Sequence, residues 1–162
     1  MSPPGRAASS SAARGERAGK LVAGVTAAVE ELRAKLPVDP ATVEVALVYL
    51  GDASEFLIQT LRSFQGKLLE RVGLGRPAAQ RDSSTDRVRL STEELERVAG
   101  DVILVATEDE AGLGVLAGNP VWQNLDTVQR GDVHQVPGFL WLTGGSALAA
   151  HAMLDDLRRI FT

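Results

Sequence analysis

Apolar residues recur at two different spacings along this chain, and each spacing predicts a different element. The apolar positions 22, 25, 29, 32 and 36 lie three or four residues apart, on one stripe of a helix that Pro37 would end. Two continuous apolar runs, at residues 43–51 and 101–107, are instead typical of strands buried on both faces of a parallel sheet. The pattern therefore predicts a long helix over residues 15–37 and then an α/β domain.

Two further segments carry recognisable helix ends. Ser63 is suited to an N-cap, and Gly73 is suited to the C-terminal stop of the same helix. Ser91 followed three residues later by Glu94 is the pattern of a capping box. Both helices fall between the two predicted strands, as crossover connections in a parallel sheet do.

The last part of the chain continues this alternation. Pro120 is placed for the first turn of a helix that carries Trp122, and residues 132–137 predict a short strand. A terminal amphipathic helix is predicted over residues 144–161. Alternating strands and helices predict a three-layer α/β/α sandwich with a mostly parallel sheet over residues 42–162.

Composition narrows the class of protein. The chain has 162 residues, of which 44% are hydrophobic, enough for the core of one domain. Its net charge of -4 argues against broad nucleic-acid binding, and the lack of cysteine excludes disulfides and thiolate metal sites. Residues 1–14, rich in Ser, Ala, Pro and Gly, predict a disordered linker or an artificial chain end, and they lack the apolar core of a signal peptide.

Catalytic signatures are not found. His134 and His151 stand without a cysteine, serine or paired carboxylate at a recognisable catalytic spacing, so we expect neither catalysis nor metal ligation. The acidic residues around Glu93, together with Asp109, are typical of solvated helix faces rather than of a cation site. The sequence therefore predicts a protein that is not an enzyme and holds no metal.

The two tryptophans have different surroundings. Trp122 lies where an amphipathic helix needs a large apolar anchor, so we expect it to be mostly buried. Trp141 follows a predicted strand and precedes Gly144 and Gly145. Ligands of open α/β sheets bind beyond the carboxyl ends of strands, where an aromatic ring can stack and glycines allow close approach. We therefore predict that Trp141 is at least partly exposed, on the wall of a ligand cleft.

A second segment could contribute to the same cleft. Residues 49–64 follow a buried strand and predict a long, partly apolar loop. Its candidate cleft residues are Phe56, Gln59 and Arg62.

Several segments together resemble a known family. They read "SFQGKLLERVGLGRPAAQ", "LSTEELERVAGDVILVAT", "NPVWQNLDTVQRGDVHQV" and a tail with "LWLTGG" that ends in "LDDL". From Val43 to Phe161 the chain resembles the C-terminal lobe of the iron-siderophore and cobalamin binding proteins of ABC importers. The third segment is the most specific, and the "LWLTGG" loop favours the ferric-siderophore branch.

The resemblance implies two α/β lobes joined by a long helix, with the ligand between them. Residues 15–37 resemble that connecting helix, and nothing before them supplies a first lobe. The chain would then be a lobe expressed alone, a truncated reading frame, or half of a two-part protein. The expected location of the full-length protein is extracytoplasmic, in the periplasm or as a surface lipoprotein. We expect the apolar stripe of the helix to dock on the chain's own domain, with a homodimer as the alternative.

The resemblance also implies partners and site residues. The partners are a ferric siderophore, an ABC permease and the missing N-terminal lobe, and no cofactor is expected beyond the iron held by the siderophore. Trp141 matches the aromatic residue that faces the siderophore, and Glu93 matches the acidic residue that docks on the permease. Arg62 offers a delocalised cation to siderophores of negative charge. The candidate ligand contacts are Trp141, Thr143, Phe56, Gln59 and Arg62.

Two other classes of protein remain as alternatives. A cytoplasmic receiver-like regulatory or interaction domain should carry an acidic cluster and a phosphoacceptor aspartate at its strand ends, whereas the first strand offers Asp52 alone and the second offers none. A fragment of an α/β enzyme would need a nucleophile or a metal-binding set. The sequence leaves open the chemical type of the siderophore, whether this lobe binds a ligand on its own, and the oligomeric state.

Overall fold

The computed structural model describes residues 6–37, 39–51, 55–82 and 84–162, so Asp52 lies outside the described residues. The elements in chain order are α1 (Arg6–Lys35), η1 (Pro40–Thr42), β1 (Val45–Leu50), β2 (Phe56–Gln59), α2 (Phe64–Val72), η2 (Ala78–Gln80), β3 (Arg87–Leu90), η3 (Thr92–Val98), β4 (Val102–Ala106), α3 (Glu110–Ala117), α4 (Pro120–Gln123), α5 (Asp126–Arg130), β5 (Val133–Val136), α6 (Gly138–Thr143) and α7 (Ala147–Phe161), where η marks a 3₁₀ helix.

The strands form one sheet in the order β3-β2-β1-β4-β5. Strand β1 pairs in parallel with β4, and β4 pairs in parallel with β5. Strand β2 is antiparallel to both of its neighbours, β1 and β3, so it is the one reversed strand of the five. The prediction of a mostly parallel sheet is therefore confirmed.

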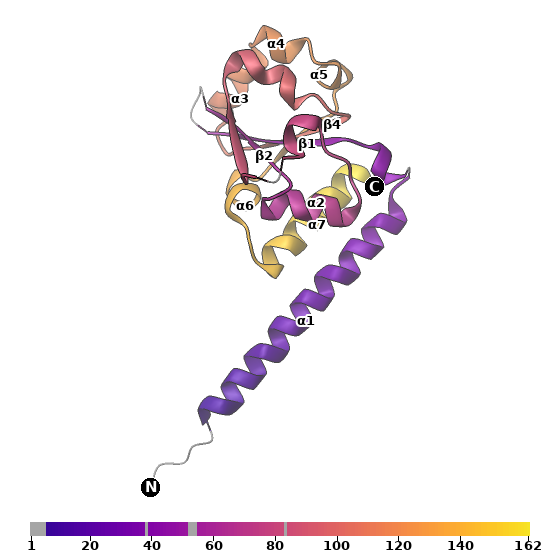
Figure 1. Ribbon diagram of the computed structural model, residues 1–162, viewed down its shortest axis with the longest axis vertical. Helices are drawn as coiled ribbons and strands as arrows, with labels where there is room; N and C mark the ends of the chain where they lie inside the picture. The colour runs from indigo at the N-terminus through magenta and orange to yellow at the C-terminus, as the bar shows by residue number, and fades with distance from the viewer. Residues whose placement is uncertain (1–5, 38, 52–54, 83) are drawn as a thin grey trace.

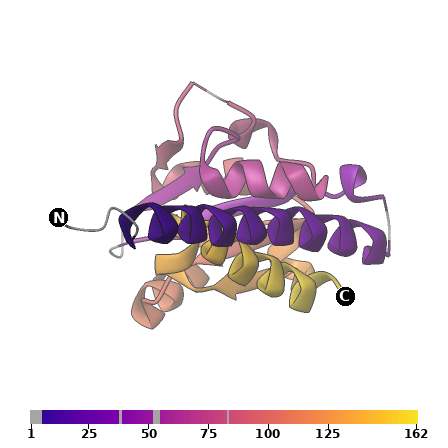
Figure 2. The same ribbon diagram turned by 90° about the horizontal axis from the view of Figure 1, so that it is seen from below.

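Helices cover both faces of this sheet. Helices α1, α2 and α7 lie side by side over one face, as Figure 2 shows from below, whereas α3, α4 and α5 lie over the other (Figure 1). Successive strand residues point to opposite faces, so Leu47 packs under the first group of helices and Val48 under the second. This arrangement is the predicted three-layer sandwich.

Helix α1 packs on the chain's own domain. Val25, Val29 and Leu32 are buried against α7 and α2, as the apolar stripe predicts. Val22 is 58% exposed, so the stripe is covered only over the C-terminal half of the helix. No helix among the described residues is long and apolar enough to cross a membrane.

The start of α1 corrects one prediction. The helix begins at Arg6, so the interpretation of residues 1–14 as disordered is wrong for residues 6–14. These residues include several Ala and Arg, whose helix propensity is high, and Pro occurs only before Arg6 in this segment. All described side chains from position 10 to 23 are exposed, and Figure 1 shows this half of α1 projecting beyond the rest of the chain.

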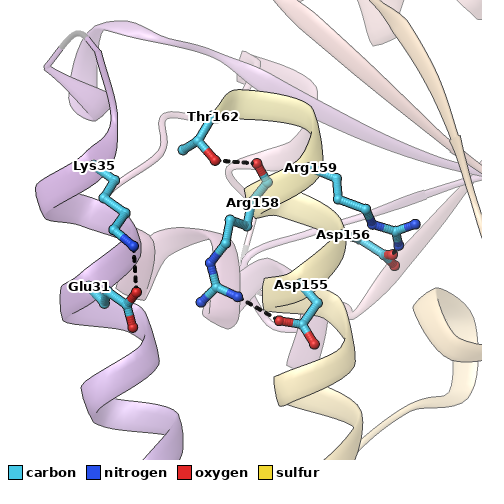
Figure 3. A network of polar contacts seen from close by, with 7 residues as sticks. All are labelled: Glu31, Lys35, Asp155, Asp156, Arg158, Arg159 and Thr162. Atoms are coloured by element: carbon cyan, nitrogen blue, oxygen red, sulfur yellow. Dashed lines mark hydrogen bonds and ion pairs between the residues drawn. The ribbon is translucent and has the colours of Figure 1, made fainter.

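Ion pairs within α1 and within α7 lie beside the contact between these two helices (Figure 3). Lys35 bonds Glu31 one turn earlier at 2.6 Å, and this bond holds the pKa of the Glu31 carboxyl below its usual value. Arg158 of α7 adds a smaller attraction in the same direction and pairs with Asp155 at 2.7 Å. These pairs are solvent-exposed, so packing of the apolar stripe is the main source of the contact's stability.

The predicted helix ends are confirmed in part. The Ser63 hydroxyl accepts the N–H of Gly66 at 2.9 Å, and Gly73 caps the C-terminus of α2. The Ser91 N–H donates to the Glu94 carboxylate at 3.0 Å, but the element that follows is the 3₁₀ helix η3 rather than an α-helix.

Three elements differ from the predicted ones. The loop predicted over residues 49–64 contains β2, which bonds strands on both sides. The helix predicted after Asn119 is divided into α4 and α5, because the backbone is extended at Leu125. Residues 138–143, expected as a loop, form α6.

Candidate functional site

A cavity opens at the carboxyl ends of β1 and β4, where ligands of open α/β sheets bind. Its volume is about 470 Å³, within the range of small-molecule sites. We call it the strand-end hollow. It is lined by Tyr49, Leu50, Gly51, Thr107, Glu108, Asp109, Gly138, Phe139, Leu142 and Thr143.

Thr107 ties together the two strand ends that form the floor of the strand-end hollow. Its hydroxyl donates to the Leu50 carbonyl at 3.0 Å and accepts the Asp109 N–H at 3.0 Å. The side chain is 1% exposed, so these bonds form out of water and fix the end of β4 against the end of β1.

Helix α6 forms one wall, and a glycine allows it to approach the floor. A Cβ on Gly138 would lie 2.9 Å from the Thr107 Cα, closer than real Cβ contacts permit. The Phe139 N–H at the same end of α6 donates to the Glu108 carboxylate at 3.2 Å. The Phe139 ring itself is 74% exposed, which makes it the most accessible large apolar side chain at the hollow.

Trp141 does not face this hollow, and the prediction that it is at least partly exposed is wrong. Its side chain is 0% exposed and packs in the core under α7. Its indole N–H donates to Asp156 Oδ2 at 2.8 Å, and its carbonyl accepts the Gln59 side-chain amide at 2.5 Å. Residues two apart on a helix point about 200° apart, so Trp141 is buried by the same turn that exposes Phe139.

Asp156 is the residue that sequence reasoning missed. It is 5% exposed on α7, and it also pairs with Arg159 through its second oxygen (Figure 3). An aspartate one turn before the end of an amphipathic helix gives no sign of burial. Trp122, by contrast, is 5% exposed, and the prediction that it is mostly buried is confirmed.

The other candidate contacts are not brought together. Thr143 lies at the strand-end hollow, where its hydroxyl donates to the Phe139 carbonyl at 2.7 Å. Phe56 and Gln59 are strand residues with 1% and 0% exposure. Arg62 is exposed and donates to the Ser84 carbonyl at 3.0 Å. Because β2 runs against β1, Arg62 follows the strand end that lies away from the hollow.

A buried polar cluster, formed by Arg76 and Gln80, lies against strands β1 and β2. Arg76 is 3% exposed, and burial lowers its pKa to about 10. Its guanidinium donates to the Gln59 carbonyl at 2.5 Å and to the Gln80 side chain, which in turn accepts the Leu47 N–H at 2.9 Å. This cluster bonds main-chain groups of β1 and β2, so its role in the structure is to join strands.

Glu93 and the histidines lie apart from the hollow. Glu93 is exposed on η3, as predicted, and no hydrogen bond or ion pair to its side chain is found within the described part of the chain. Its neighbour Glu94 does have partners: hydrogen bonds from Ser91, and to a smaller extent from Arg97, lower the pKa of the Glu94 carboxyl. Across the described residues, no group of three or more His, Cys, Asp or Glu is placed to hold a metal ion.

Comparison with known sequences identifies relatives of this lobe. A model of the periplasmic binding protein family matches residues 12–138. The probable siderophore-binding lipoprotein YfiY of Bacillus subtilis (strain 168) is 30% identical over 112 residues, 61% of this chain and 34% of that protein. The achromobactin-binding periplasmic protein of Dickeya dadantii (strain 3937) is 30% identical over 104 residues, 60% of this chain and 34% of that protein.

Solved structures share the fold. The siderophore periplasmic binding protein from the fuscachelin gene cluster of Thermobifida fusca superposes with a TM-score of 0.77 at 24% identity, over 91% of this chain and 54% of that one. The triscatecholate siderophore binding protein FeuA of Bacillus subtilis, complexed with ferri-bacillibactin, gives a TM-score of 0.78 at 20% identity, over 90% of this chain and 53% of that one.

The chain spans 34% of the length of the two curated relatives and about half the length of the solved ones. The family model nevertheless matches most of its residues, and the α/β lobe and its long helix are shared with the solved structures. This chain therefore belongs to the periplasmic binding protein family.

Proposed function

We propose that this chain is the ligand-binding C-terminal lobe of an ABC-importer protein for ferric siderophores. The observation that carries the proposal is the strand-end hollow, with the exposed ring of Phe139 on its wall, at the carboxyl ends of the parallel strands. Two curated relatives are named for siderophore or achromobactin binding. In this role the lobe supplies shape and contacts, the siderophore holds the iron, and no bond is made or broken by the protein.

We also propose which surface a second lobe would contact. The resemblance implies that the ligand lies between two lobes, and the chain spans about half the length of its solved relatives. The side chains of α1 from position 10 to 23 are exposed, and the strand-end hollow is open. A second lobe resting on that half of α1 and closing over the hollow would bury both. The extracytoplasmic location proposed for the complete protein follows that of the relatives named as a periplasmic protein and a lipoprotein.

The ligand contacts proposed at the hollow are Phe139 and Thr143. Phe139→Ala should weaken binding of a ferric siderophore by about 2- to 12-fold, because the contact of an exposed aromatic ring is worth about 0.5–1.5 kcal/mol. The dissociation constant is measured by titration calorimetry with ferrichrome. Leu148→Ala is the matched control, since Leu148 is 71% exposed on α7 and does not line the hollow. Equal losses in the two variants, or none in either, would contradict the proposed site.

Glu93 is proposed to contact the permease. Glu93→Ala should change the free energy of unfolding by less than about 0.5 kcal/mol, because an exposed carboxylate without a partner contributes little. Iron uptake by cells that depend on the protein should fall, while siderophore affinity stays the same. Glu96→Ala, an exposed carboxylate on the same 3₁₀ helix, is the control. Normal uptake with the Glu93 variant would exclude a docking role for this residue.

A further inference from the structure

The strand-end hollow carries charge of one sign. The charged side chains among its described lining residues are Glu108 and Asp109, both carboxylates. A second cavity of about 430 Å³ shares Thr107 and Glu108 with it and adds Glu110. Three consecutive acidic residues therefore stand at the carboxyl end of β4, beside the apolar wall that α6 provides.

These carboxylates have no cationic partner among the residues that the structure describes. Glu108 accepts a main-chain N–H from Phe139, which is a dipole and not a cation. The ion pairs formed between described residues involve other acidic side chains, and none includes Glu108, Asp109 or Glu110. A bound ligand therefore meets their charge directly.

The described cations that could balance an anionic ligand are already paired or lie elsewhere. Arg89 pairs with Glu55 at 2.5 Å, and Glu55 lies beside Gly51 of the hollow, so the Arg89 charge is balanced by a carboxylate. Arg62 is bonded to the Ser84 carbonyl beyond the far end of β2. Lys67 and Arg71 line a separate groove of about 280 Å³ between α1, α2 and α7. The lobe thus presents an apolar wall and negative charge to its ligand, the reverse of what a polyanionic chelate needs.

We propose that the chelate bound at the strand-end hollow is neutral or carries a net positive charge, an inference that rests on the proposed function. Like charges repel across a partly exposed cavity, so a negative chelate is disfavoured there and a positive one is attracted. Hydroxamate groups each lose a single proton on binding Fe³⁺, so a complete hydroxamate shell leaves a neutral centre. Catecholate groups lose twice as many protons and leave a negative one. The geometry therefore points to the hydroxamate class.

This inference separates the chain from one of its structural neighbours. FeuA is described as a triscatecholate siderophore binding protein, complexed with ferri-bacillibactin. A ferric complex with three catecholate groups carries a net negative charge. A shared fold at 20% identity leaves the lining residues free to differ, so the charge at the hollow is a property of this chain's own sequence.

The test compares three ferric chelates at low ionic strength. Ferric desferrioxamine B is positive, ferrichrome is neutral, and ferri-bacillibactin is negative. The chain should bind the first two at least about tenfold more tightly than the third, and added salt should narrow this difference. Equal or tighter binding of ferri-bacillibactin would overturn the charge inference and leave the proposed function standing. Binding of none of the three would contradict the proposed function itself, and this inference with it.

Matched variants assign the preference to the hollow. The double variant Glu108→Gln and Asp109→Asn keeps hydrogen-bonding side chains and removes both charges, so the preference should fall to about threefold or less. The control double variant, Glu30→Gln and Glu70→Gln, removes the same formal charge from exposed positions on α1 and α2, outside the surface proposed for the second lobe. Its preference among the three chelates should match that of the unaltered chain. Circular dichroism verifies that both are folded. Loss of the preference in the control would place its origin outside the hollow and overturn the inference.

Discussion

Gly66→Ala is expected to destabilise the lobe by about 3 kcal/mol, the upper part of the usual range for overpacking. An alanine Cβ at this position of α2 would lie 1.9 Å from the Thr60 carbonyl oxygen, and no rotamer change can relieve a clash with main chain. The same carbonyl accepts the Ser63 hydroxyl at 2.8 Å, so moving it also disturbs the N-cap of the helix. The measurement is the free energy of unfolding from urea titration followed by circular dichroism.

A second glycine provides the control with the opposite sign. Gly19 lies in the exposed half of α1, and a Cβ there meets no atom within 4 Å. Gly19→Ala should therefore leave stability unchanged or raise helix content, since alanine in a helix is favoured over glycine by about 0.5–1 kcal/mol. Similar effects of the two substitutions would show that α2 does not approach the Thr60 turn as closely as described.

Trp141→Ala is expected to lower the free energy of unfolding by about 3–5 kcal/mol, the usual cost of removing a buried tryptophan. The ring is fully buried, and its loss would also leave Asp156 without its indole partner. The measurement is urea unfolding followed by the fluorescence of Trp122. A change below about 1 kcal/mol would support the original expectation of an exposed ring and contradict its buried position.

Trp141→Phe separates packing from hydrogen bonding. Phenylalanine keeps most of the apolar contact but removes the indole N–H, so the buried Asp156 carboxylate loses one of its two partners. We expect a loss of about 1–3 kcal/mol from the unsatisfied acceptor together with the smaller ring. Trp141 itself does not line the strand-end hollow, so this variant should bind the siderophore as the unaltered chain does unless the substitution moves α6.

The sequence predicts best the elements whose signals are local. Strands β1 and β4 are continuous apolar runs, and the ends of α2 carry Ser63 and Gly73. Strand β2 was missed because it has only four residues and follows β1 through a short connection. Its stability comes from hydrogen bonds to β1 and β3. The sequence of residues 56–59 alone does not reveal these partner strands.

The strand-end hollow lies where the sequence analysis expects a ligand cleft, but most of the residues that line it differ from the expected ones. Its position beyond the strand ends, and Thr143 on its wall, follow from the general location of ligands in open α/β sheets. The orientation of Trp141 depends on two partners distant in sequence, Gln59 and Asp156, so no local pattern reveals it. Phe139, two residues before Trp141, occupies the exposed position that the sequence interpretation gave to the tryptophan.

The uneven covering of α1 has a consequence for cooperativity. Val25, Val29 and Leu32 couple the C-terminal half of the helix to the core, so its amides open to solvent only when the domain unfolds. The half before Gly24 has exposed side chains from position 10 to 23 and is held by its own backbone bonds, which give an isolated helix of this length marginal stability. One continuous helix therefore contains two thermodynamic segments. Amide hydrogen exchange would be slow in one segment and fast in the other, with the boundary near the point where burial begins.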